Sequence, residues 1–253
     1  MYSILKRLAL SLLPSSALDA LEFPLRSLYY PFVKGDKVHC PCCNRSYKSF
    51  QEMNREDFED QLCPGCGSIQ RTRLLREYLN LEFPKLQELH ILHFSPHKYL
   101  RKIILNEKPA NYYDTDFVST RCRYQFDITA LELDSNSLDL IIAYHIFEHI
   151  PNDRLAMQEC FRTLKPNGRM LAQVPWREER TIEDPSITDP KDRLRLFGQE
   201  DHVRYYGRED FIKRLEELGF EVQEKKAQDL FDANTLEKES LRGEEIIFDC
   251  FKP

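Results

Sequence analysis

The chain has neither an excess of positive charge nor a long hydrophobic run. Its 36 lysines and arginines are outnumbered by 42 aspartates and glutamates, which gives a formal net charge of −6. This balance offers no general attraction to a phosphate backbone, so bulk nucleic-acid binding is not favoured, although a local basic patch stays open. With 42% hydrophobic and 31% charged residues over 253 positions, the composition is that of a globular protein with a substantial core.

The amino terminus lacks the apolar length of a signal peptide or a membrane span. Lys6 and Arg7 precede the short run LALSLL, which ends before Pro14. We therefore expect an amphipathic helical segment over residues 1–36, with a cleaved signal as the less favoured alternative. This segment packs on the protein or, helped by its cations, lies on a membrane surface, so residues 1–30 are the candidate for peripheral membrane contact.

The eight cysteines lack the spacing of a secreted disulfide framework. Four form two C-x-x-C pairs, whereas Cys122, Cys160 and Cys250 stand alone in the sequence. This usage favours a reducing, cytoplasmic compartment, with membrane association as an open possibility.

The two cysteine pairs have the spacing of a zinc site. The motif C-x2-C-x19-C-x2-C supplies four thiolate ligands, with Cys42 as a spare thiol: Cys40, Cys43, Cys63 and Cys66. Because protein fills all four positions, we predict a structural zinc ribbon over residues 37–68 that stabilises the fold rather than performing chemistry. A redox C-x-x-C pair or unrelated buried thiols are the alternatives.

A helix is predicted directly after the ribbon, over residues 68–80, with Ser68 as its cap. Its three arginines, Arg71, Arg73 and Arg76, are expected on the solvated or domain-facing side. Contact with phosphate or substrate is the alternative interpretation of these arginines.

From residue 86 onward, strand and helix patterns alternate. The run from Leu138 to Tyr144 is almost entirely apolar, as in a parallel strand buried on both faces. Strands are expected at 89–94, 110–116, 139–144, 169–174, 220–225 and 245–251, with helices near 97–106, after Pro151 and after Arg208, and a short hairpin-like connection before the last strand. This alternation predicts a doubly wound α/β domain with helices on both faces of a parallel sheet.

Several motifs together resemble class I S-adenosylmethionine-dependent methyltransferases of the type 11 group. The matching segments are Cys63–Ser68, ILHFSP at 91–96, Asp127–Thr129, His145–Asp153, Leu164–Gly168, Gln173–Pro175 and Phe197–Gly207. The resemblance covers about residues 86–251, and residues 40–251 together resemble a zinc-ribbon subgroup with unassigned substrates. It implies S-adenosyl-L-methionine as cofactor and a Rossmann-like, mostly parallel, seven-stranded sheet over residues 69–253, with the last strand antiparallel.

The resemblance implies that the cofactor lies at the carboxyl ends of the first strands. The family's acidic residue and G-x-G-x-G loop are absent: His93 stands at the acidic position, and Ser95 and His97 lie in the replacement loop. These three are candidate contacts to the methionine part, or they complete a structural loop in a domain without cofactor. Asp116 is the candidate for the ribose hydroxyls, with Asp114 as runner-up.

Three further positions are implied as cofactor contacts. Asp127 and Ile128 match the position that recognises the adenine amino group, although a turn or cap role beside Thr129 competes for Asp127. His149 is placed to close over the cofactor.

The resemblance also locates the reacting groups. His145 follows the fourth strand and is the first candidate for base or substrate positioning, and His202 is the second. Residues 177–206 are expected to form a substrate lid, in which Tyr205 and Tyr206 anchor the lid or stack on a planar substrate. A second metal at the H-x-x-E-H of residues 145–149 is a minor alternative to polar residues that solvate a helix start.

Three functions stay open at this point. The first is methyl transfer to a small molecule or a lipid-linked or glycan intermediate. The second is an RNA or protein methyltransferase, for which Arg71, Arg73 and Arg76 have to form a basic path with Lys48 and Arg45. The third is a non-catalytic binding module of methyltransferase fold.

Overall fold

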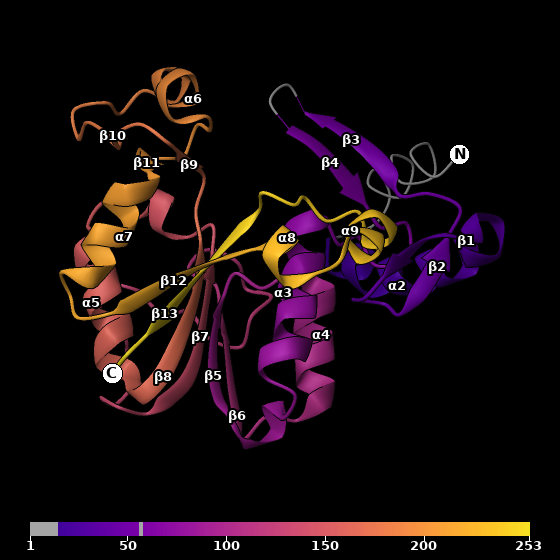
Figure 1. Cartoon of the computed structure of the whole chain (residues 1–253), viewed down its shortest axis with the longest axis horizontal. Helices are drawn as coiled ribbons and strands as arrows, with labels where there is room; N and C mark the ends of the chain where they lie inside the picture. Colours follow the sequence, from indigo (N-terminus) through magenta and orange to yellow (C-terminus); the bar gives the residue numbers. More distant parts are fainter. Residues whose placement is uncertain (1–14, 56–57) are drawn as a thin grey trace. The chain divides into compact units, whose positions relative to one another are not determined.

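The chain, seen here as a computed structural model that describes residues 15–55 and 58–253, divides into two compact units. The first comprises Met1–Glu82 and Phe231–Gly243, and the second comprises Phe83–Leu230 and Glu244–Pro253 (Figure 1). Both units are therefore discontinuous in sequence. The predicted border at residue 68 differs from this division, because the helix after the ribbon and a segment near the carboxyl terminus pack with the ribbon.

The first unit is small and mixes short hairpins with helices. Its elements are α2 (Ser15–Val33), β1 (Lys34–Cys40), β2 (Arg45–Tyr47), β3 (Gln51–Arg55), β4 (Phe58–Leu62), α3 (Gln70–Glu82) and α9 (Ala233–Glu239). The pairs β1–β2 and β3–β4 are antiparallel. Residues 1–14, where much of the predicted amphipathic segment falls, lie outside the described residues. Over the part that is described, no helix combines the length and the apolar character needed to cross a membrane.

The second unit contains a six-stranded sheet in the order β12-β13-β8-β7-β5-β6. Its strands are β5 (His90–Phe94), β6 (Asn111–Thr115), β7 (Leu138–Tyr144), β8 (Leu164–Gln173), β12 (Glu221–Lys226) and β13 (Ile246–Phe251). The four strands from β8 to β6 are parallel, and β13 is antiparallel to both of its neighbours. The predicted mostly parallel Rossmann-like fold with an antiparallel last strand is confirmed.

Helices cover both faces of this sheet. The helical elements between its strands are η1 (Leu86–Glu88), α4 (Lys98–Glu107), η2 (Phe147–His149), α5 (Asp153–Thr163), α7 (Arg208–Glu216) and α8 (Ala227–Leu230). Figure 1 shows α5 and α7 on one side of the sheet and α4 on the other. Asn152 caps α5, since its side chain accepts a hydrogen bond from the backbone N–H of Leu155.

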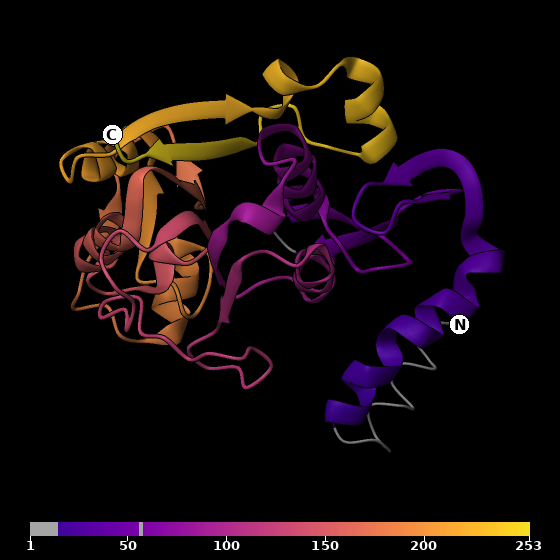
Figure 2. The same ribbon diagram turned by 90° about the horizontal axis from the view of Figure 1, so that it is seen from below.

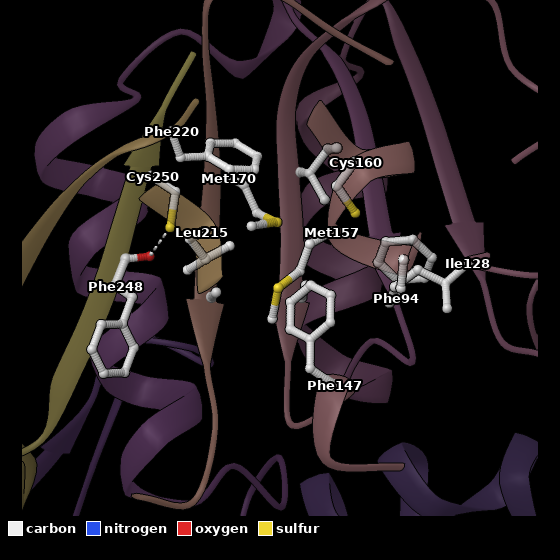
Figure 3. Packing of buried hydrophobic residues seen from close by; sticks show 14 of the residues in the cluster. Phe94, Ile128, Phe147, Met157, Cys160, Met170, Leu215, Phe220, Phe248 and Cys250 are labelled. Atoms are coloured by element: carbon white, nitrogen blue, oxygen red, sulfur yellow. Dashed lines mark hydrogen bonds between the residues drawn. The ribbon is translucent and has the colours of Figure 1, made fainter. Parts of the chain in front are cut away.

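The main core lies between the sheet and the helices α5 and α7. Figure 3 shows Phe147, Met157, Met170, Leu215 and Phe248 packed together from the helical and strand sides. All five are fully buried, and burial of such a side chain contributes about 2 kcal/mol each. The apolar run of β7 supplies the centre of the sheet because both of its faces are covered.

The predicted count of seven strands is wrong, because residues 116–137 form no strand. Among the described residues, this segment forms one isolated bridge, between Thr115 and Tyr124. The segment is instead turned by side chains: Asp116 accepts hydrogen bonds from the backbone N–H groups of Val118 and Ser119. These hydrogen bonds turn the chain directly after β6, and the segment continues as a loop.

The connection between β12 and β13 is also not the short hairpin that was expected. Figure 2 shows the two strands running side by side and joined through the helical segment that carries α8 and α9. Residues 231–243 of this connection belong to the first unit.

The strand order creates a topological switch point between β5 and β7. From β5 the chain crosses through α4 to β6 on one side, and β7 then pairs with the other side of β5. In open α/β sheets, ligands bind in the crevice outside the carboxyl ends of the strands at this point.

Candidate functional site

Two residues with left-handed backbone follow the strands that flank the switch point. Ser95 comes directly after β5 with φ of 42°, and His145 directly after β7 with φ of 54°. Each turn is fixed by a backbone hydrogen bond, from Ser95 N–H to the carbonyl of Thr115 and from His145 N–H to that of Gln173. A residue other than glycine adopts this left-handed conformation at a cost of about 1–3 kcal/mol, and such backbone strain is concentrated at functional sites. The loop without glycines thus still makes the tight turn.

Buried polar atoms without partners gather at the same edge of the sheet. Within the described residues, His145 Nε2, Glu148 Oε2 and Gln173 Oε1 are buried and make no hydrogen bond. A buried polar atom left unpaired costs about 1–3 kcal/mol. These atoms follow β7 or end β8, which is where the switch point places a ligand.

His145 and Glu148 are joined to each other. His145 Nδ1 lies 3.1 Å from Glu148 Oε1, and the Glu148 side chain is almost fully buried. When Nδ1 carries the proton and donates it to the carboxylate, Nε2 of His145 keeps a free lone pair. The pair therefore presents an imidazole that can accept a proton.

The end of the predicted lid lies against the same turn. The backbone N–H of Val203 donates to the carbonyl of Glu148, and Arg204 donates to the carbonyls of Phe147, Ile150 and Pro151. Tyr206 is buried and donates to Asp153, so it anchors the segment and does not stack on a substrate. The rest of the segment folds as β9 (Trp176–Arg177), β10 (Ile182–Glu183), α6 (Pro190–Phe197) and β11 (Arg204–Gly207), at one end of the sheet (Figure 1).

His149 and His202 meet beside Glu148. Their ring centroids lie 4.7 Å apart at an interplanar angle of 82°. His149 Nδ1 lies 3.3 Å from Asp201 Oδ2, and His202 Nδ1 lies 2.9 Å from the carbonyl oxygen of Phe197. Burial lowers the pKa of His202, which favours its neutral form. Sequence reasoning treated His202 as a separate candidate base and did not anticipate this cluster, because residues 149 and 202 meet only through the tertiary fold.

The two aspartates near the end of β6 have different environments. Asp114 is fully buried and paired with Arg101 and Arg123. Burial tends to raise its pKa, but hydrogen bonds from the two arginines outweigh it and hold the pKa below the usual value. Asp116 is half-buried, and both of its hydrogen bonds to backbone N–H groups go to Oδ1. Asp114 is therefore a structural anchor, which leaves Asp116 as the candidate for a diol.

The two histidines predicted at the first loop, His93 and His97, also have different surroundings. His93 lies inside β5, almost fully buried, with Nδ1 3.0 Å from the hydroxyl of Tyr112. Burial lowers its pKa to about 3, so it is neutral at physiological pH. His97 is half-buried and directly precedes α4, and Ser95 is exposed. The structure thus places Ser95 and His97 on the loop and His93 within the sheet.

Asp127 is exposed and forms a local turn. Its Oδ1 accepts hydrogen bonds from the backbone N–H and the hydroxyl of Thr129, and the hydrogen bonds from Thr129 lower its pKa. Its neighbour Ile128 is buried in the main core. The turn role that competed with adenine recognition is therefore present in the structure.

In the first unit, the four predicted zinc ligands come together. One sulfur from each of Cys40, Cys43, Cys63 and Cys66 lies within 4.8 Å of the others. Two of these pairs, Cys40–Cys66 and Cys43–Cys63, have sulfur separations of 3.6 Å and 3.7 Å. A zinc ion bound tetrahedrally by thiolates at about 2.3 Å has edges of about 3.8 Å between sulfurs. The geometry therefore fits a zinc site with four cysteine ligands.

Arg73 lies beside this cluster and is buried, so of the two expected orientations it does not have the solvated one. It is fully buried and donates to the backbone carbonyls of four residues: Gln61, Ser68, Glu239 and Ser240. The expected cap Ser68 is likewise not a cap, since α3 begins at Gln70 and the Ser68 hydroxyl lies 3.2 Å from the sulfurs of Cys40 and Cys66. The local sequence could not reveal this, because two of the acceptors of Arg73 lie more than 160 positions away.

Comparisons with known proteins agree with this fold. Residues 62–172 match the family model described as a methyltransferase domain. A chain in the complex between the Haloferax volcanii Trm112 methyltransferase activator and a protein described as a methyltransferase aligns with a TM-score of 0.50 at 11% identity, covering 72% of this chain and 91% of that chain. An S-adenosylmethionine-dependent methyltransferase from Mesorhizobium loti aligns with a TM-score of 0.47 at 12% identity, covering 70% and 97%.

A third similar structure is the Burkholderia thailandensis 1,6-didemethyltoxoflavin-N1-methyltransferase, solved with 1,6-didemethyltoxoflavin and S-adenosylhomocysteine. It has a TM-score of 0.47 at 10% identity, and the match covers 72% of this chain and 76% of that chain. No curated protein matches the sequence. At 11% identity and a TM-score of 0.50, the first of these structural likenesses speaks for the fold alone.

The sheet order and the family match together point to a methyltransferase. Residues 62–172 match a methyltransferase domain, and the six-stranded, mostly parallel sheet is Rossmann-like.

Proposed function

We propose that this enzyme transfers a methyl group to a small-molecule, lipid-linked or glycan acceptor at the carboxyl edge of its sheet. The observation that carries the proposal is the switch point between β5 and β7, with the left-handed residues Ser95 and His145 on its two sides. When bound there, S-adenosyl-L-methionine supplies an electrophilic methyl group on a sulfonium.

The residues around the switch point fit such a cofactor. Ser95 and His97 offer polar side chains to an amino-acid moiety on the loop after β5, and Asp116 offers a carboxylate oxygen to a ribose diol. Asp127 and Ile128 stay proposed for the adenine end, with Asp127 using the oxygen that does not bind Thr129. His93, being buried and neutral, supports the loop from within β5.

His145 is the proposed base or positioning group. Its Nδ1 is held by Glu148 and its Nε2 is unpartnered in the described part of the chain, so it can accept a proton from an acceptor hydroxyl or amine. Glu148 fixes the ring and stabilises the imidazolium that forms. His149 and His202 are less suited to contact the cofactor or to act as bases on their own, since both rings are engaged with each other and with the lid.

The acceptor is not favoured to be RNA. The basic path required for RNA includes Arg73, which is buried and occupied by backbone carbonyls. A lipid-linked acceptor gains support from α2, where Leu21, Leu25, Leu28 and Phe32 form an exposed stripe at helical spacing and the latter two are 75% and 73% exposed. Arg45 and Lys48 lie against α2 through Ser27 and Phe32, which adds positive charge beside the stripe.

We assign the four-cysteine cluster to a structural zinc ion and the protein to a reducing compartment, the cytoplasm. The sulfur separations fit tetrahedral zinc, and all four positions are filled by protein. None of the eight cysteines, all of which lie in the described part, forms a disulfide.

Calorimetry with S-adenosylmethionine and S-adenosylhomocysteine tests the cofactor site. We expect saturable binding to the full chain, about 10-fold weaker in Asp116→Asn because a diol loses its charged acceptor, and unchanged in the matched variant Asp134→Asn. Absence of binding to the zinc-loaded protein contradicts the proposal. Sedimentation with vesicles containing anionic lipid tests the surface stripe: Leu28→Glu and Phe32→Glu abolish binding, and Val118→Glu retains it.

A further inference from the structure

We propose that Glu148, His149 and His202 form a second metal site, for a divalent transition-metal ion, separate from the four-cysteine cluster. One ligand atom from each of these residues lies within 4.8 Å of the others. Two imidazoles and one carboxylate are a donor set that suits iron, manganese, cobalt or zinc rather than magnesium or calcium.

The hydrogen bonds of the cluster leave a lone pair on each of the three side chains. His202 Nδ1 faces the carbonyl oxygen of Phe197 at 2.9 Å, and a carbonyl can only accept, so the proton is on Nδ1 and Nε2 is free. His149 Nδ1 lies 3.3 Å from a carboxylate oxygen of Asp201, an ion-pair distance that leaves the other ring nitrogen, Nε2, available. A histidine whose other nitrogen donates to a carboxylate or a carbonyl is the arrangement that metal-ligating histidines adopt.

The carboxylate is divided between two roles. Glu148 Oε1 accepts from His145, whereas Glu148 Oε2 is buried and has no partner among the described residues. A carboxylate oxygen buried beside two imidazoles is costly to leave unpaired, and a cation compensates that cost. One oxygen therefore orients His145 and the other is available to the ion.

The fold holds the three ligands together. Glu148 and His149 belong to η2, and His202 is tied to η2 through its neighbour Val203, whose N–H donates to the carbonyl of Glu148 at 2.9 Å. Arg204 adds a second connection at 2.9 Å to the carbonyl of Phe147. The site is thus built from the end of β7 and the end of the 177–206 segment, which these hydrogen bonds join.

Three protein ligands leave coordination positions open. The His149 side chain is 30% exposed, which gives an ion a route to the site. An ion bound there can take an oxygen of the acceptor and lower the pKa of its hydroxyl next to His145. That use of the ion rests on the proposed methyl transfer, whereas ion binding itself does not.

Titration of the full, zinc-loaded chain with Co²⁺ tests the site. We expect about one tightly held cobalt per chain by metal analysis, weak visible absorption without a thiolate-to-cobalt charge-transfer band, and a melting temperature that rises with cobalt concentration. Glu148→Gln and His149→Gln reduce cobalt affinity more than 10-fold, and the outer partner variant Asp201→Asn reduces it about 10-fold. His90→Gln, at the amino end of β5, leaves it unchanged.

Two results overturn the proposal. One is equal cobalt binding by the parent, Glu148→Gln and His149→Gln when circular dichroism shows all three folded. The other is a charge-transfer band that accounts for all bound cobalt, which places the ion on cysteines. Because His149 is partly exposed, its variant folds even if Glu148→Gln does not. Calorimetry with S-adenosylhomocysteine on the same samples separates failure of the metal site from failure of the cofactor site.

Discussion

The four-cysteine cluster and the Glu148–His149–His202 cluster are both convergences of metal-ligating side chains, but they are built in opposite ways. The cysteines come in pairs from two tight turns and fill every position of a tetrahedron. The other cluster takes its residues from two segments more than fifty positions apart, and one of its carboxylate oxygens has no partner in the described part of the chain. A closed donor set stabilises a fold, whereas an incomplete one can exchange ligands.

Removal of a cysteine ligand is expected to have the largest effect. Cys63→Ser leaves three thiolates, and structural zinc contributes about 10–16 kcal/mol of apparent binding free energy in small domains, so the first unit unfolds. Metal analysis and a thermal melt measure this. The matched variant Cys42→Ser, at the spare buried thiol, retains one zinc per chain. Retention of zinc by Cys63→Ser contradicts the closed-site assignment.

Replacement of Arg73 tests whether this buried cation stabilises the fold around the four-cysteine cluster. Arg73→Met leaves four backbone carbonyls without their donor and lowers the free energy of unfolding by about 3 kcal/mol or more. Urea denaturation measures the loss. Arg195→Met, at an exposed arginine of the other unit, changes stability by less than about 0.5 kcal/mol. An equal loss of stability in the two variants would contradict this role of Arg73.

The pH dependence of folding stability tests the burial of His93, a structural histidine that lies outside the Glu148–His149–His202 cluster. Its folded pKa of about 3 lies below the unfolded value of about 6.5, so between these values the unfolded chain binds a proton that the folded chain does not. Stability is complete above about pH 6.5 and is about 2 kcal/mol lower at pH 5.

Denaturation of the parent and of His93→Gln at pH 7.5 and pH 5 checks this. The parent loses about 2 kcal/mol more than the variant over this interval, because other groups titrate equally in both. Identical losses show that His93 takes up its proton without unfolding.

Glycine substitution at left-handed positions gives the smallest difference. Ser95→Gly relieves the strained turn after β5 and raises the free energy of unfolding by about 1 kcal/mol. Asn44→Gly, between the cysteines and β2 with φ of 51°, gains less because asparagine tolerates this conformation. Denaturation curves compare the two, and a loss of stability in Ser95→Gly shows that its side chain contributes more than its backbone costs.

Local pattern and spacing were sufficient for much of the molecule. The apolar run of β7 has the bounds predicted for it, Leu138–Tyr144, because burial on both faces leaves a continuous signal. The spacing of the cysteines predicted which four of them come together in the structure. The start of α5 followed from Pro151-Asn152-Asp153, where the structure shows the Asn152 cap.

Features that depend on distant partners could not be predicted. Arg73 has the spacing of a surface residue on α3, and only the carbonyls of Glu239 and Ser240 explain its burial. No strand forms between residues 116 and 137, where Arg123 instead pairs with Asp114 of β6. Likewise, His202 met Glu148 only because Val203 and Arg204 bind η2.

The contribution of residues 231–243 to the first unit has a consequence for biosynthesis. Arg73 donates hydrogen bonds to the carbonyls of Glu239 and Ser240, which are synthesised more than 160 residues after it. The amino-terminal unit therefore cannot complete its packing as it emerges, and a fragment ending at Glu82 lacks part of its own interior. Synthesis must pass Ser240 before the first unit can be completed.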